Sequence, residues 1–310
     1  MTHVFGPVPS RRLGLSLGVD LIPSKTCTFD CIYCQVGRTT NKTLEEGPFV
    51  PVGEVVAQIE ERLLICTPDV ITLAGSGEPT LYSEIAGVIQ GIKGITKTDV
   101  VLLTNGSLFW REEVRRRVLE ADIIMPTLSS AFDATFRSIH RPHHGLDLKT
   151  VVKGLRLLRK DYTGRLYLEV VLLAGINDTQ REIRGLKALI DRIHPEKIQL
   201  NTVVRPPSDA RAKPLDRDRL EEIKLFFGEK AEIIATTPVL GKAGQGDLLV
   251  KQFLDMVKRR PLSPTDAADS LGLSLEGAKG LIKGLVIKGF IRRQEHLGEV
   301  FYLINEEDGR

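Results

Sequence analysis

Short apolar segments alternate with longer amphipathic segments as far as residue 227. Segments such as 70–74 and 99–104 are rich in apolar and β-branched residues, which predicts buried strands. Segment 52–66 has apolar residues three and four positions apart, which predicts a helix with one buried face. The predicted strands are 15–22, 70–74, 99–104, 122–127, 165–173 and 197–203, and the predicted helices are 52–66, 81–95, 110–120, 146–159, 179–193 and 216–227.

This alternation predicts an α/β fold in which helices cover a parallel sheet. Six strand–helix units are fewer than the eight that close a barrel, so we expect a partial (β/α)6 TIM-like barrel with an open side. Ligands of parallel α/β folds bind beyond the carboxyl ends of the strands. The residues that follow each strand are therefore the first candidates for a functional site.

The pattern changes after a glycine-rich stretch at 237–247, which is typical of a linker. Helices are predicted at 248–258, 266–271 and 274–288, followed by a two-stranded hairpin over 289–304. This order resembles a winged helix-turn-helix domain. We therefore predict a barrel domain over 1–236, a linker over 237–247 and a winged-helix domain over 248–310.

Three of the four cysteines lie within eight residues, directly after the first predicted strand. Cys27, Cys31 and Cys34 can surround one metal centre. A cubane iron–sulfur cluster normally takes four thiolates, so three would leave one iron open to a non-protein ligand. An open position is typical of a working metal site. The alternative is a zinc site that a histidine completes, although no Cys/His pair with closing spacing follows.

The spacing Cys-x3-Cys-x2-Cys, with Tyr33 before the last cysteine, resembles the signature of the radical S-adenosylmethionine (SAM) superfamily. The resemblance covers about residues 6–235. It implies a [4Fe-4S] cluster on the three cysteines, SAM chelated to the open iron, and a 5′-deoxyadenosyl radical that abstracts hydrogen from substrate. Over the whole chain the resemblance is closest to bacterial and archaeal members that begin Gly-Pro-Val-Pro-Ser-Arg-Arg-Leu-Gly. They are loosely related to the wybutosine-synthesising enzyme, whose second cluster this chain has no cysteines to hold.

The resemblance also implies SAM contacts at the strand ends. Gly77 and Glu78 belong to a stretch that resembles the family's Gly-Gly-Glu motif, which holds the amino group of SAM, although Ser76 replaces the first glycine. Taken singly, each such stretch is also ordinary turn chemistry. The full set of expected cofactor-binding residues is Tyr33, Gly77, Glu78, Thr104, Ser129, Ile176 and Leu200.

Composition and charge indicate the cellular compartment of the protein and the partners of its tail. Four cysteines without a secretory segment predict a reducing compartment, the cytoplasm, and no apolar run is long enough to cross a membrane. The net charge of +3 is unevenly placed, since residues 251–293 hold nine basic and four acidic side chains. Lys279 and Lys283 share one face of the third tail helix, where such modules read DNA. The tail is therefore expected to bind a protein or the barrel itself or, alternatively, nucleic acid.

Three other features have two interpretations each. Pro7 and Pro9 bar a helix, and the following Arg11 and Arg12 could bind a carboxylate or phosphate, or be a solvated pair at the rim. The loop with His140, His143 and His144 could bind an anionic substrate or lie exposed. Cys66 is expected to pack in the core, with a hydrogen-donor role as the alternative.

These observations predict a single-cluster radical SAM enzyme that receives its electron from a flavodoxin- or ferredoxin-like donor. Its substrate is left open, with RNA or protein as candidates. One alternative is an activase that installs a radical on a partner protein docked on the tail. Another is a metal-sensing DNA-binding regulator.

Overall fold

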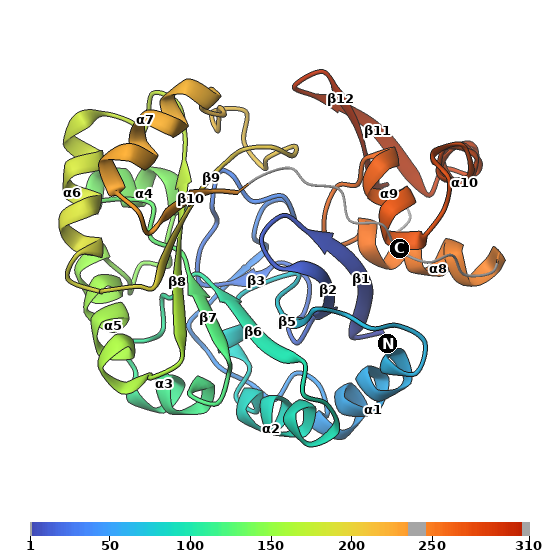
Figure 1. Ribbon diagram of the computed structural model, residues 1–310, viewed down its shortest axis with the longest axis horizontal. Helices are drawn as coiled ribbons and strands as arrows, with labels where there is room; N and C mark the ends of the chain where they lie inside the picture. Colours follow the sequence, from blue (N-terminus) through green and yellow to red (C-terminus); the bar gives the residue numbers. More distant parts are fainter. Residues whose placement is uncertain (1, 235–245, 306–310) are drawn as a thin grey trace.

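The computed structural model describes residues 2–234 and 246–305, so most of the predicted linker 237–247 lies outside the described residues. One part of the molecule is an eight-stranded sheet with helices along its outer side (Figure 1). The other part is a smaller group of three helices and a hairpin.

The six predicted parallel strands are confirmed, and they lie side by side in chain order. They are β2 (Gly14–Val19), β5 (Val70–Leu73), β6 (Asp99–Thr104), β7 (Ile123–Pro126), β8 (Arg165–Leu172) and β9 (Lys197–Thr202). Their carboxyl ends therefore meet at one edge of the sheet. The cysteine loop follows β2 and lies at that edge, as predicted.

Two edge strands were missed by the hydrophobic pattern. β1 (Val4–Ser10) pairs antiparallel with β2, and the short β10 (Ala231–Ile233) pairs parallel with β9. The two prolines of β1 argued against a helix, but they are tolerated on an edge strand whose register shifts between Phe5 and Val8. The sheet is therefore mixed and not purely parallel.

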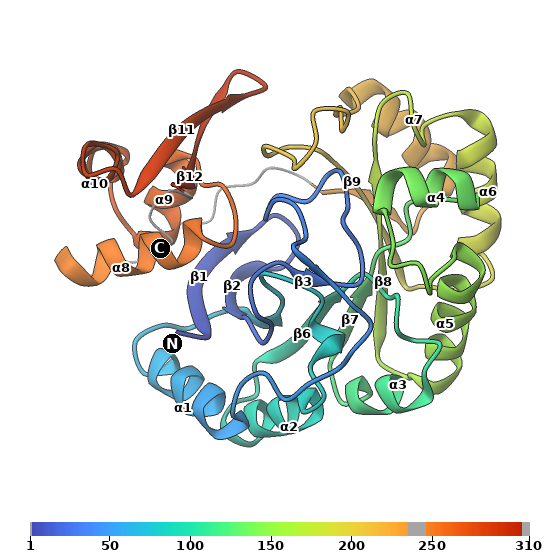
Figure 2. The ribbon, with the colours of Figure 1, turned by 180° about the vertical axis from the view of Figure 1, so that it is seen from behind.

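Helices cover the outer face of the sheet, as Figures 1 and 2 show. Three of them begin at a capping side chain: Asp147 caps α5, Thr179 caps α6 and Asp216 caps α7. The apolar sides of these helices and of the strands form one continuous core. The helices are α1 (Val52–Leu63), the 3₁₀ turn η1 (Pro79–Leu81), α2 (Ile85–Ile95), α3 (Glu112–Val118), α4 (Asp133–His140), α5 (Leu148–Asp161), α6 (Gln180–Ile190) and α7 (Arg217–Phe227).

The tail contains the elements that its sequence predicts. They are α8 (Gly246–Val257), α9 (Pro264–Leu271), α10 (Leu275–Ile287), β11 (Ile291–His296) and β12 (Glu299–Ile304). A capping box of Ser263 and Asp266 starts α9, and Gly272 ends it at φ +64°.

The tail packs against β1. Phe5 and Val8 of β1 share an apolar cluster with Phe253 and Leu262 of the tail. Arg259 forms an ion pair with the buried Asp20 across this contact, with 3.1 Å between Nε and Oδ2. In the described part of the chain, no helix has the length and apolar character that a membrane span requires.

Candidate metal and cofactor site

The cysteine loop is fixed through its backbone from two sides. The short strand β3 (Thr26–Cys27) pairs with β4 (Asn41–Lys42), and the turn after β5 holds its start: Lys25 N donates to Ser76 O at 2.8 Å. On the other side, Asp30 N donates to the carbonyl of His140 at 2.9 Å. These backbone hydrogen bonds fix the shape of the loop.

Gly77 is required for this close approach. A Cβ at this position would overlap with the carbonyl oxygen of Thr26 and would lie 2.7 Å from Ile22 Cγ2. Because the Thr26 carbonyl belongs to the backbone of the cysteine loop itself, the loop would have to move to remove this overlap. Glycine here thus serves the packing of the loop against the turn after β5.

The three clustered thiols are reduced and partly exposed. Burial, and then the negative charge of Glu78, raise the pKa of Cys27 to about 12. Burial and the neighbouring Cys27 and Cys34 raise the pKa of Cys31 well above its ordinary value. Three thiols that oppose one another's ionisation form a site that a cationic metal centre would stabilise as thiolates.

In residues 2–234 and 246–305, no three His, Cys, Asp or Glu side chains are gathered closely enough to hold one metal ion. A cubane cluster places each thiolate on a different iron atom, so its ligands stand farther apart than those of one ion. The loop with its three mutually interacting thiols fits such a cluster.

Two polar side chains contact the cysteines. Asn105 Nδ2 lies 3.6 Å from Cys27 Sγ and donates to Thr28 Oγ1 at 2.7 Å. His140 Nδ1 lies 3.3 Å from Cys31 Sγ and 3.4 Å from the hydroxyl of Tyr33. Burial lowers the pKa of His140 to about 3, so its ring is neutral.

His140 was expected in a loop that binds an anionic substrate or lies exposed, and neither interpretation fits its buried position on a helix. It lies on the buried side of α4 with Phe136 and Ile139, and this apolar spacing was the signal that could have identified it. His143 and His144 lie beyond the helix, with their ring centroids 4.0 Å apart. Cys66 packs against the core as predicted, and its thiol donates to Arg62 O at 3.1 Å.

The expected SAM contacts fall into two groups. Tyr33, Gly77 and Ile176 are partly exposed and accessible to a ligand. The other four side chains are buried among protein atoms, which is not the position that we expected for contacts to SAM. They are Glu78, Thr104, Ser129 and Leu200.

The Glu78 carboxylate joins the ends of two strands. Its Oε1 accepts from Thr80 Oγ1 at 2.6 Å, from Thr80 N at 3.0 Å and from Thr104 Oγ1 at 2.6 Å, and its Oε2 accepts from Asn105 N at 2.8 Å. Burial raises the pKa of Glu78 even though these donors favour the charged form. Glu78 and Thr104 therefore hold β5 to β6.

Ser129 and Leu200 have comparable supporting positions. Ser129 Oγ accepts from Val171 N at 2.9 Å, while Leu200 is fully buried in the main core. Asn177, which the sequence analysis did not single out, donates to Ser129 O and Val171 O and accepts from Leu173 N. These bonds brace the end of β8.

A polar group lies on the sheet near Tyr33. Glu169 of β8 accepts from Asn201 Nδ2 at 2.8 Å and forms an ion pair with Arg12 at 3.0 Å. Burial alone would raise the pKa of Glu169, but Arg12 and Asn201 outweigh burial and lower the pKa. Burial raises the pKa of Tyr33, and the negative charge of Glu169 contributes to this rise, so the polar group adjoins the cysteine site.

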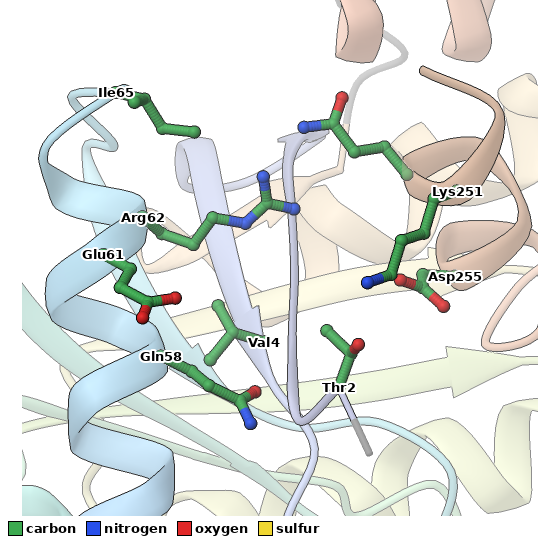
Figure 3. A pocket seen from close by; sticks show the side chains of 9 residues that line it. Thr2, Val4, Gln58, Glu61, Arg62, Ile65, Lys251 and Asp255 are labelled. Carbon is green, nitrogen blue, oxygen red and sulfur yellow. The ribbon is translucent and has the colours of Figure 1, made fainter. Parts of the chain in front are cut away.

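A separate cavity of about 390 Å³ lies between α1, β1 and α8 (Figure 3). Thr2, Gln58, Arg62 and Lys251 are among the residues that line it, and no cysteine is among them. It is therefore distinct from the cysteine site.

The family model of the radical SAM superfamily matches residues 21–186, which include the cysteine loop and the strands β5 to β8. The chain belongs to the radical SAM superfamily. It is therefore an iron–sulfur enzyme of the class that uses a [4Fe-4S] cluster and SAM and that needs an external electron donor.

Within the superfamily the chain groups with the UPF0026 proteins. Such a protein from Methanocaldococcus jannaschii is 33% identical over 315 residues, which cover 98% of this chain and 97% of that protein. A Brachyspira hyodysenteriae protein described as GTPase Obg is 35% identical over 307 residues, but this chain spans only 45% of its length. A radical SAM methyltransferase structure from Sphaerobacter thermophilus has a TM-score of 0.54 at 18% identity, over 70% of this chain and 65% of that one, and is similar in fold.

Proposed function

We propose that this chain cleaves SAM reductively, with Cys27, Cys31 and Cys34 as the thiolate ligands of one cluster. The observation that carries the proposal is the placement of three mutually interacting, partly exposed thiols on a fixed loop at the carboxyl edge of the sheet. When bound, the cluster and SAM supply a 5′-deoxyadenosyl radical that abstracts hydrogen from a substrate.

The chain's own residues position these groups. The backbone at Gly77 would hold the amino group of SAM. Ile176 would lie against the adenine face and Tyr33 would present backbone groups to the adenine amine, and both side chains pack on one apolar cluster. Four further residues act by holding the strand ends in place. They are Glu78, Thr104, Ser129 and Leu200.

The tail is proposed to be a winged-helix domain over 248–310 that recruits the substrate, joined through 237–247 to the barrel domain over 1–236. Three helices followed by a hairpin support this proposal. Lys279 and Lys283 are both exposed on α10, the helix that reads nucleic acid in such modules. The electron comes from a flavodoxin- or ferredoxin-like donor, and the enzyme works in the reducing cytoplasm.

Anaerobic purification tests the proposal, because the loaded protein should be brown and hold about four irons per chain. Dithionite with SAM should yield 5′-deoxyadenosine. Cys31→Ala should lose both iron and product, while Cys66→Ala is the matched control and should keep both. Zinc in place of iron, with no 5′-deoxyadenosine, would favour the metal-sensing regulator and contradict the proposal.

A further inference from the structure

Four arginines gather where the barrel meets the tail. Arg11 and Arg12 lie in the turn between β1 and β2, Arg205 follows β9, and Arg260 follows α8. Their charges act on one another: Arg205 and Arg12 both oppose the charge of Arg11, and Arg205 and Arg11 oppose that of Arg260. Segments distant in sequence thus bring like charges together.

Within the described part of the chain, two of these arginines have an acidic partner within ion-pair distance. Arg12 pairs with Glu169 at 3.0 Å, and Arg205 pairs with Asp266 at 3.2 Å. Among the described residues, Arg11 and Arg260 have no carboxylate so close, and the one hydrogen bond of the Arg11 side chain goes to Asn201 Oδ1 at 3.3 Å.

Several guanidinium nitrogens in this group are buried and make no hydrogen bond within the described part of the chain. They are Arg12 Nη1, Arg205 Nε, and Nε and Nη2 of Arg260. The Arg205 side chain is only 10% exposed. Burial, and then the neighbouring arginines, lower the pKa of Arg11 to about 10, and burial with Arg205 lowers that of Arg260 to about 9. Such groups destabilise a fold unless an anion compensates them.

A cavity of about 670 Å³, within the size range of small-molecule sites, adjoins two of the arginines, and Arg12 and Arg260 are not among its lining residues. Arg11 and Arg205 line one side, and the start of α9, α10 and the β11–β12 hairpin line the other. Its other titratable and charged lining groups are Asp266, Asp269, Lys279, His296 and Glu299. The three acidic groups balance Arg11, Arg205 and Lys279 over the lining as a whole. The excess of positive charge comes from Arg260, which interacts with Arg11 and Arg205 from outside the lining.

We infer that this cavity binds a phosphate group of the substrate, with Arg11 and Arg205 as the phosphate-binding residues and Arg260 as a positioning residue whose charge acts on both. Guanidinium groups from two segments present more donors than the two oxygens of a carboxylate can accept, whereas a tetrahedral phosphate accepts from several directions. The substrate would then be a nucleotide, either free or within an RNA strand. Only the identification of the ligand as the substrate rests on the proposed function.

Calorimetric titration of the cluster-loaded full chain tests this inference with three probes: inorganic phosphate, adenosine monophosphate and a short single-stranded RNA. We expect saturable binding that weakens about tenfold or more in Arg260→Gln and in Arg11→Gln. Arg116→Gln is the matched control, because it removes one positive charge from an exposed side chain on α3, and it should change the affinity less than twofold. Tighter binding of RNA than of adenosine monophosphate would place the phosphate in a strand, and equal binding would indicate a free nucleotide.

The inference fails if no probe saturates, or if Arg260→Gln and Arg116→Gln weaken binding equally. Thermal unfolding adds a second measurement, which distinguishes a role of Arg260 in phosphate binding from a purely structural role of this residue. In phosphate-free buffer, Arg260→Gln should unfold at the same or a higher temperature than the parent, because it removes an unpaired buried charge. Excess phosphate should stabilise the parent but not the variant.

A lower melting temperature of Arg260→Gln that phosphate does not affect would show that Arg260 is structural and would overturn the inference. Formation of 5′-deoxyadenosine from SAM and dithionite, measured on the same preparations, separates the two proposals. Product without phosphate binding contradicts only this inference, and phosphate binding without product contradicts only the proposed function.

Discussion

Replacement of Glu78 by Gln tests whether this residue supports the site or contacts SAM. The substitution keeps the shape of the side chain but replaces one acceptor oxygen by an N–H donor. If the amide nitrogen takes the place of Oε2, it faces the N–H of Asn105, and one buried donor loses its partner. The three bonds to Oε1, from Thr80 and Thr104, change from charge-assisted to neutral.

An unpaired buried donor costs about 1–3 kcal/mol, and each weakened bond costs a further fraction of a kcal/mol. Relief from burying the charge offsets part of this loss, because burial raises the pKa of Glu78. We therefore expect Glu78→Gln to lower the free energy of unfolding by about 2–3 kcal/mol. For a domain of this size that corresponds to roughly 4–10 °C in melting temperature.

The assay is thermal unfolding at a fixed scan rate, together with equilibrium binding of SAM well below the melting temperature. Glu60→Gln, an exposed substitution on α1, is the control and should change stability by less than about 0.5 kcal/mol. A melting temperature of Glu78→Gln equal to that of the parent, accompanied by loss of SAM binding, would refute this reasoning. Glu78 would then contact SAM directly.

Three further predictions concern the supports of the site and of the tail. Gly77→Ala should lower the iron content and destabilise the protein, because the added Cβ would overlap with the backbone of the cysteine loop. The control is Gly53→Ala, whose added Cβ would meet no atom within 4 Å, and it should leave the iron content unchanged. Arg259→Met should lower the free energy of unfolding by about 3 kcal/mol, because the buried Asp20 loses its cationic partner, although it keeps its hydrogen bonds from Ser76. Limited proteolysis should then cut the tail faster, and equal cleavage rates would contradict this. Burial alone would raise the pKa of Asp266, but Arg205 and Arg260 lower it below its ordinary value of 3.8. Its charged form therefore adds stability above about pH 4, and this stability is lost as the pH falls further. Below about pH 4 the free energy of unfolding of Asp266→Asn should fall less steeply with pH than that of the parent. Parallel curves for the two proteins would contradict the pairing of Asp266 with the arginines.

Much of the fold and the centre of the site follow from local patterns. The spacing of apolar residues predicted the six parallel strands and most helices, because a strand or helix must bury one side along its own length. The spacing of Cys27, Cys31 and Cys34 indicated the cofactor class, since a single loop brings these thiols together whatever the rest of the chain does. The edge strand β1 escaped detection because its pairing depends on a neighbour and not on its own composition.

Only the tertiary structure decided which polar groups meet. His140 contacts Cys31 across 109 residues of sequence, and Arg205 meets Asp266 across 61 residues. It also joined Glu78 and Thr104 by a hydrogen bond, because adjacent strand ends put donor and acceptor side by side. No periodicity encodes such pairs: a side chain's spacing predicts the face on which it lies, whereas its partner depends on how distant segments pack.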